Sequence, residues 1–165
     1  MNRFFVCLLL CLAFSTSAQN WQMSGFKKAD SFNPILKPSL EARFLDPVTG
    51  KIVGWENKNV LNPTALVLNG LVHLLYRAQD SVGTSRIGLA TSADGIHFKK
   101  QAAPILFPAN DPFRGFEWPG GIEDPRIVET SDDGYFLTYT SYDGKVARLC
   151  GAFSKDLQTL SLIHI

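Results

Sequence analysis

The residues of this sequence best suited to chemistry lie in GGIEDPRIV, residues 120–128, where Glu123 and Asp124 are adjacent carboxylates directly before a proline. A carboxylate pair at the entry to a strand can form a turn, bind a metal ion or act as an acid catalyst. Aspartate before proline commonly starts a turn, and so does asparagine before proline, as at Asn62 in LNPTA. Taken singly, each of these motifs favours a turn.

Three further side chains are candidates for binding a substrate. Arg77 directly follows the apolar run LVHLLY, and a guanidinium in that position needs an anionic or hydroxyl-rich partner. Trp118 and Phe116 lie in a loop bounded by proline and glycine residues. They can belong to the core or form a platform on which a sugar stacks, and we favour the platform.

Histidine and cysteine offer less chemistry. The three histidines show no metal-ligand spacing, so no metal site is predicted. His73 is predicted to lie in the core and His97 on the surface of an edge strand, while His164 belongs to the last residues of the chain. Cys150, in an apolar strand pattern, is predicted to be a small core residue rather than a nucleophile.

The elements that must position these residues are short strands joined by turns. Four turn motifs stand between apolar runs, at Pro47–Gly50, Asn69–Gly70, Asp94–Gly95 and Asp132–Gly134. No segment of useful length shows helical periodicity. The sequence therefore predicts an all-β fold of two antiparallel, mostly four-stranded sheets.

An internal repeat relates the two halves of this pattern. Three residue pairs recur at a spacing of about 63 residues, namely Pro63 and Pro125, Tyr76 and Tyr139, and Gly88 and Gly151. Groups of three or four strands that recur at a fixed period indicate the blades of a β-propeller, and this chain holds about two. Asn62 and Asp124 each precede an aligned proline, so both are expected to face the same central channel, with Arg77 beside them.

The N-terminus predicts export. Residues 1–18 combine Arg3, the apolar run FFVCLLLCLAF and small residues before Gln19, which is typical of a secretory signal peptide. A lipoprotein anchor at Cys11 is the weaker alternative, because Leu10 is bulky where such sites need a small residue. The mature protein is therefore expected in the periplasm or outside the cell, free of the membrane after cleavage.

Composition narrows the possible partners. The formal net charge is +1 and no basic stripe occurs, so nucleic-acid binding is not expected.

The last six residues, 160–165 (LSLIHI), match what a transposon-end adapter encodes in one frame, and we predict that they are non-native. An ordinary apolar terminal strand is the alternative. On either interpretation, 19–159 is expected to be the N-terminal part of a longer protein.

The segments NPTA, YRA, SRIGLATSADGIHF and GGIEDPRIV resemble glycoside hydrolase family 130, the inverting β-mannoside phosphorylases and related mannosidases. The resemblance runs from about Phe32 to Thr159 and implies a five-bladed propeller with its active site in the central channel. It also implies functional residues. The general acid is Asp124, and the residues that bind the mannosyl unit are Asn62, Arg77 and, by a weaker match, Arg86.

Trp118 and Glu123 complete the predicted substrate site, Trp118 as a stacking surface and Glu123 as a neighbour that tunes Asp124. Repulsion from the negative charge of Glu123 favours the protonated form of Asp124, and the positive charge of Arg126 favours the ionised form. The sequence leaves open which effect is larger. In the family, the acid relays its proton through a sugar hydroxyl. A manno-oligosaccharide is the expected substrate and inorganic phosphate the expected co-substrate, with no cofactor.

Phosphorolysis explains why one strong carboxylate is enough. Phosphate arrives already anionic, so a phosphorylase needs one acid and a cationic cradle, whereas an inverting hydrolase needs a second carboxylate to activate water. The family's phosphate-binding residues lie beyond this chain, which is expected to be inactive by itself. Three alternatives stay open: an exported β-mannosidase that hydrolyses its substrate, another five-bladed glycosidase, and a non-catalytic carbohydrate-binding propeller.

Overall fold

The computed structural model describes residues 25–131 and 133–163. The predicted signal peptide (residues 1–18), Asp132 and His164 lie outside the described residues. No helix among the described residues is long and apolar enough to cross a membrane.

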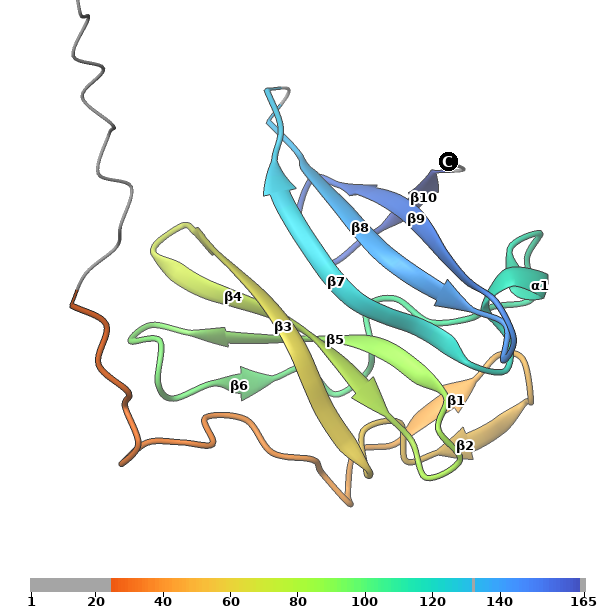
Figure 1. Ribbon diagram of the computed structural model, residues 1–165, viewed down its shortest axis with the longest axis horizontal. Helices are drawn as coiled ribbons and strands as arrows, with labels where there is room; N and C mark the ends of the chain where they lie inside the picture. The colour runs from red at the N-terminus through yellow and green to blue at the C-terminus, as the bar shows by residue number, and fades with distance from the viewer. Residues whose placement is uncertain (1–24, 132, 164–165) are drawn as a thin grey trace, which may run out of the picture.

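Apart from one four-residue helix, the regular secondary structure of the described residues consists of strands, which confirms the all-β prediction (Figure 1). A small hairpin comes first and consists of β1 (Phe44–Asp46) and β2 (Lys51–Val53). The first unit then comprises β3 (Asn59–Leu68), β4 (Leu71–Gln79), β5 (Ser85–Ser92) and β6 (Lys99–Lys100). The second unit comprises β7 (Gly121–Glu129), β8 (Tyr135–Tyr142), β9 (Ala147–Ser154) and β10 (Ser161–Ile163).

The predicted turns at Pro47–Gly50, Asn69–Gly70 and Asp94–Gly95 each join neighbouring antiparallel strands. The strands on either side of the fourth, β7 and β8, also pair antiparallel. At Asn69–Gly70 both residues have positive φ, 52° and 74°, as a two-residue hairpin turn requires. A one-turn helix that the pattern did not predict, α1 (Arg114–Glu117), precedes the second unit. The terminal residues of β10 pair with β9 like an ordinary strand, and the origin of 160–165 stays a prediction.

The two units were predicted as separate sheets, and this was wrong in one respect. They form a single eight-stranded sheet, because Ser85 and Gly121 make one parallel pair between β5 and β7. Gly121 has φ 104°, and a Cβ there would collide with the backbone of Ser85. Only glycine lets the two backbones approach this closely, so the join depends on the second glycine of GGIEDPRIV.

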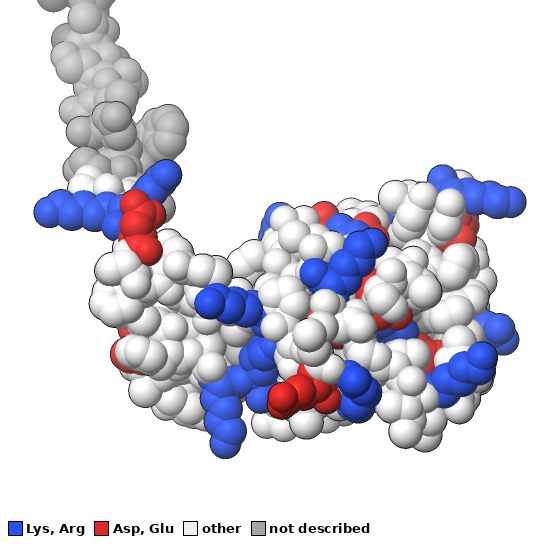
Figure 2. Space-filling view, turned by 90° about the horizontal axis from the view of Figure 1, so that it is seen from below, with Lys and Arg blue, Asp and Glu red and all other residues white. Residues whose placement is uncertain are grey.

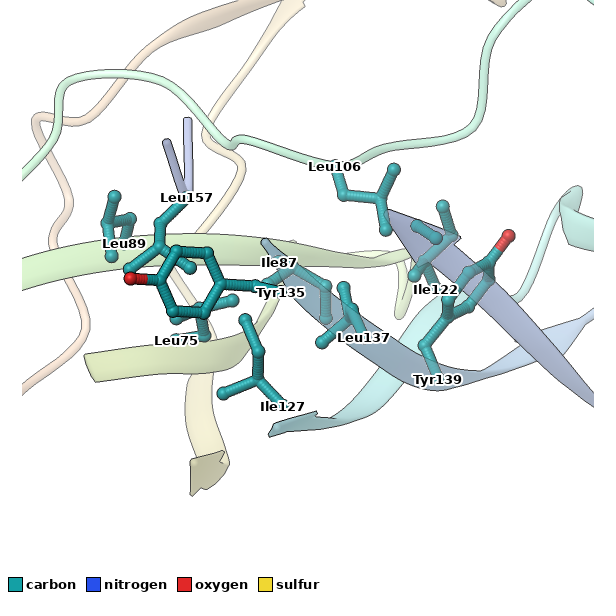
Figure 3. Packing of buried hydrophobic residues seen from close by; sticks show 11 residues of the cluster. Leu75, Ile87, Leu89, Leu106, Ile122, Ile127, Tyr135, Leu137, Tyr139 and Leu157 are labelled. Atoms are coloured by element: carbon teal, nitrogen blue, oxygen red, sulfur yellow. The ribbon is translucent and has the colours of Figure 1, made fainter. Parts of the chain in front are cut away.

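The main hydrophobic core lies between the two units. Alternate residues of β5 and β8 point into it, and Figure 3 shows Ile87 packed beside Leu137 in this cluster. A second cluster around Trp55 and Tyr76 covers the opposite face of the first unit. The far face of the second unit is more open, with Leu149 67% exposed. The two clusters thus cover both faces of the first unit at β4 and β5, whereas β3, at the edge of the sheet, has no buried residue.

Candidate active site

Asn62 and Asp124 occupy equivalent and unusual backbone positions. Both have positive φ, 43° and 50°, a region that asparagine and aspartate tolerate better than most residues. Each lies where the strand register shifts, between Leu61 and Thr64 in one unit and between Glu123 and Arg126 in the other. Bulges of this kind redirect a side chain and are frequent beside active sites. The repeat read from the sequence therefore places the two residues in matching bulges.

These bulges bring the two side chains into contact. Nδ2 of Asn62 donates a hydrogen bond to Oδ1 of Asp124 at 2.7 Å. Arg77, opposite Leu61 in the β3–β4 hairpin, donates from Nη1 to the same oxygen at 3.2 Å and from Nη2 to Oε1 of Glu123 at 2.6 Å. Four of the predicted site residues thus meet where β3 and β7 lie against each other. The prediction that Asn62, Arg77 and Asp124 lie side by side is confirmed.

Ser85 completes this cluster, although it was not predicted from the sequence. Its hydroxyl accepts from Nε of Arg77 at 3.0 Å and donates to Oε1 of Glu123 at 3.2 Å. Ser85 is fully buried and reaches the cluster because β5 meets β7 at Gly121. A serine at the start of a strand carries no signal of its own, so only the pairing of the two units could reveal it.

The acid candidate is the most accessible carboxylate of the cluster. The side chain of Asp124 is 37% exposed, against 16% for Glu123 and Arg77. Among the described residues, both hydrogen bonds to the Asp124 side chain end on Oδ1, so Oδ2 is the oxygen that a ligand would meet. Glu123 is held by Arg77 and Ser85, while Nη1 of Arg126 donates to the carbonyl of Pro125. The carboxylate of Asp124 is thus open to a ligand, and the guanidinium of Arg77 and the hydroxyl of Ser85 lie in the same cluster.

Arg86 lies apart from this cluster. Its side chain is 1% exposed, and its guanidinium pairs with Oδ2 of Asp46 at 2.5 Å and Oδ2 of Asp80 at 2.9 Å. Burial raises the pKa of Asp46, but hydrogen bonds from Arg86 and Thr49 outweigh it and hold that pKa below its ordinary value. Arg86 thus joins the β1–β2 hairpin to the loop between β4 and β5. The hairpin and this loop lie side by side in Figure 1. These contacts favour a structural role, and its contact with a sugar stays a prediction.

The two aromatic residues of the predicted platform lie in different places. Trp118 is half-buried and lines a cleft of about 400 Å³ together with Tyr142, Gly144 and Arg86. Phe116 lines a separate pocket beyond α1, where the guanidinium of Arg148 lies 5.2 Å from its ring centroid. The helix causes the separation, because it ends at Glu117 and the chain continues in an extended conformation at Trp118. The prediction that Trp118 and Phe116 form one sugar-stacking platform is therefore wrong.

The remaining predictions concern histidine, cysteine and metal. His73 is half-buried and not in the core, since the start of β4 is open to solvent. The side chain of His97 is 80% exposed, as predicted, but it lies in the turn between β5 and β6 and not in an edge strand. Cys150 is half-buried against the core. The described residues contain no group of three or more His, Cys, Asp or Glu side chains that could hold a metal ion. On the face drawn in Figure 2, positive and negative side chains are interspersed.

Glu117 is a buried carboxyl that the sequence did not single out. It is 1% exposed, and Oε1 accepts a hydrogen bond from the hydroxyl of Tyr139 at 3.0 Å. Burial raises the pKa of Glu117 to about 7; the hydrogen bond from Tyr139 lowers it and the charge of Asp111 raises it. A pattern of apolar and aromatic residues around a lone glutamate gives no indication of such a shift.

This raised pKa makes stability depend on pH. The folded state holds the proton more tightly than the unfolded chain, so the stabilisation is complete below the ordinary pKa of 4.5 and is lost as the pH rises through about 7. Glu117→Gln removes this loss, and we expect it to raise the free energy of unfolding at pH 8 by about 3 kcal/mol relative to its effect at pH 4. Urea unfolding at both pH values measures the difference. Glu129→Gln, at an exposed position, is the control, and equal pH profiles for the two variants would contradict the prediction.

Comparison with known proteins assigns the chain to a family. A family model described as β-1,4-mannooligosaccharide phosphorylase matches residues 29–163. A 1,2-β-oligomannan phosphorylase of Thermoanaerobacter sp. (strain X514) is 35% identical over 138 residues, which cover 77% of this chain and 40% of that protein. The chain therefore spans about two fifths of the length of this relative.

Solved structures agree. A glycosyl hydrolase from Bacteroides ovatus is 39% identical with a TM-score of 0.83, covering 87% of this chain and 42% of its own. A structure from work on GH130 glycoside hydrolases that target β-1,2-mannosidic linkages in Candida mannan is also 39% identical, with a TM-score of 0.84 and coverage of 87% and 42%. The matched model and these structures together show that the chain belongs to glycoside hydrolase family 130.

Proposed function

We propose that the protein containing this chain cleaves β-mannosidic linkages of manno-oligosaccharides with inversion, by phosphorolysis, and that Asp124 is its general acid. The observation that carries the proposal is the pair of matched bulges that hold Asn62 and Asp124 in contact, with Arg77 bound to both carboxylates. Asn62 and Arg77 then bind the mannosyl unit beside the acid. The family's five-bladed propeller is proposed for the whole protein, with the two units as adjacent blades.

The proposed reaction needs one proton donor in this chain. Asp124 gives a proton to a hydroxyl of the bound mannose, and that hydroxyl gives its own proton to the glycosidic oxygen as the bond to the anomeric carbon breaks. A phosphate oxygen forms the new bond from the opposite face, so a β-mannoside yields α-mannose 1-phosphate. The residues that would hold phosphate are not assigned within this chain.

Hydrolysis is the second candidate, favoured by a specific observation. One of the solved structures similar to this chain comes from work on GH130 hydrolases that act on β-1,2-mannosidic linkages. We also propose export, on the signal-peptide pattern of residues 1–18, and a sugar phosphate made outside the cytoplasm is hard to recover. Water would then attack the anomeric carbon, and a second carboxylate from outside this chain would take its proton.

A product assay separates the two reactions. The full-length protein is incubated with β-1,2- and β-1,4-mannobiose, with and without inorganic phosphate, and the products are followed by proton NMR. Phosphorolysis requires phosphate and gives α-mannose 1-phosphate, whereas hydrolysis gives α-mannose first in either buffer. Cleavage of neither disaccharide, by a folded protein that still binds them, would leave a non-catalytic carbohydrate-binding propeller and contradict the proposal.

The cleft beside Trp118 is proposed to hold a further sugar unit of the substrate. It opens next to the cluster, since Gly120 and Thr84 in its lining adjoin Gly121 and Ser85. Trp118→Ala is expected to raise KM for a mannotriose by about 5- to 10-fold, because stacking on an aromatic ring contributes about 1 kcal/mol. The KM for a mannobiose should change less. Equal effects on both substrates, or Trp118→Phe no better than alanine, would place the sugar elsewhere.

A further inference from the structure

The two units share a buried glutamate–tyrosine pair. In the first unit, the hydroxyl of Tyr76 donates to Oε2 of Glu56 at 2.9 Å. In the second, the hydroxyl of Tyr139 donates to Oε1 of Glu117 at 3.0 Å. The two tyrosines are equivalent in the internal repeat, and both glutamates are 1% exposed. Each unit therefore contains a buried glutamate that accepts a hydrogen bond from the equivalent tyrosine, on the corresponding face of the unit.

The two pairs differ at the other carboxylate oxygen. Oε1 of Glu56 binds the ammonium group of Lys100, on β6, at 2.5 Å, and that group also donates to the carbonyl of Lys37. Oε2 of Glu117 is buried and has no hydrogen-bond partner among the described residues. A buried carboxyl oxygen without a partner is unfavourable, so this oxygen is suited to a donor. The first unit shows which donor the arrangement accepts.

Glu117 lies in the wall of a pocket that has room for such a donor. The pocket has a volume of about 160 Å³, and Phe113, Phe116 and Cys150 also line it, together with Ile163 from the segment 160–165. Aromatic rings favour a cation near them. The charged groups around it are Asp111 before α1, and Arg148 on β9, whose Nη1 is held by Oδ2 of Asp143 at 2.7 Å. The guanidinium is thus engaged at the rim and does not pair with Glu117 in the structure.

We propose that this pocket binds an ammonium group, which pairs with Oε2 of Glu117 as Lys100 pairs with Glu56. The group belongs either to a small alkylamine or to a lysine side chain that enters the pocket, and the chemistry of recognition is the same for both. Tyr139 holds the carboxylate in place, and the aromatic rings surround the aliphatic part of the ligand. The proposal does not depend on the mannoside activity.

Carbon-13 NMR of the Glu117 carboxyl carbon tests the proposal in the folded protein that contains this chain. The probe is n-propylammonium chloride, with sodium chloride at the same ionic strength and n-propanol as controls. Binding of propylammonium should lower the pKa of Glu117 by about 1 to 3 pH units, as a close opposite charge does, and neither control should do so. Glu117→Gln identifies the signal, and Glu129→Gln should leave the response unchanged.

A bound lysine gives a different result that also supports the proposal. The pKa of Glu117 is then low already in sodium chloride, propylammonium does not change it, and replacement of one lysine by methionine raises it. The proposal is overturned if propylammonium leaves the pKa of Glu117 unchanged and no lysine replacement raises it.

Discussion

Replacing Asp124 by asparagine is expected to lower the turnover of β-mannobiose by a factor of about 10²–10⁴. Asparagine keeps the shape of the side chain, and its carbonyl oxygen can still accept the bonds that Asn62 and Arg77 donate to Oδ1. Its amide group is not acidic enough to give a proton to the sugar hydroxyl that protonates the glycosidic oxygen. The loss should therefore appear in kcat, while sugar affinity changes little.

The measurement is steady-state kinetics on the full-length protein, with melting curves to show that each variant is folded. Glu123→Gln is the matched control, because it changes the adjacent carboxyl group, which is not the proposed acid. Arg77 and Ser85 both donate hydrogen bonds to Oε1 of Glu123. Glu123→Gln should lower kcat less than Asp124→Asn does. A folded Asp124→Asn variant with near-normal turnover would place the acid elsewhere.

Replacing Arg86 by methionine is expected to destabilise the protein by about 3–5 kcal/mol. The substitution keeps most of the aliphatic volume but leaves Asp46 fully buried and Asp80 6% exposed without their cation. The pKa of Asp46 is held below its ordinary value partly by Arg86, so the variant should lose most stability near neutral pH and less in acid. Urea unfolding at pH 7 and pH 4 checks both statements.

Two further variants test whether the loss of stability comes from the buried charges that Arg86 pairs with. The double variant Asp46→Asn with Arg86→Met removes one unpaired charge and should recover part of the stability. Arg77→Met changes an arginine that is 16% exposed and should lower mannoside affinity more than stability. If Arg86→Met instead melts like the parent and weakens sugar binding, Arg86 is a substrate residue and the structural role is wrong.

The sequence by itself determined the hairpins and the residues at their ends. Asn69–Gly70 and Asp94–Gly95 predict turns because few residues adopt positive φ without strain, and the strands on either side pair as expected. The repeat set Asn62 and Asp124 at equivalent positions, and their matched bulges confirm it. These features are local, or recur along the chain, so spacing alone reveals them.

The tertiary structure alone decided which side chains meet across the two units. Ser85 enters the cluster through one parallel pair at Gly121, and Arg86 binds Asp46 from a hairpin far along the chain. Periodicity shows which face of a strand a residue occupies, but not which strand will cover that face. The pKa of Glu117 has the same origin, because it is raised by burial, which exists only once α1 is packed against β8.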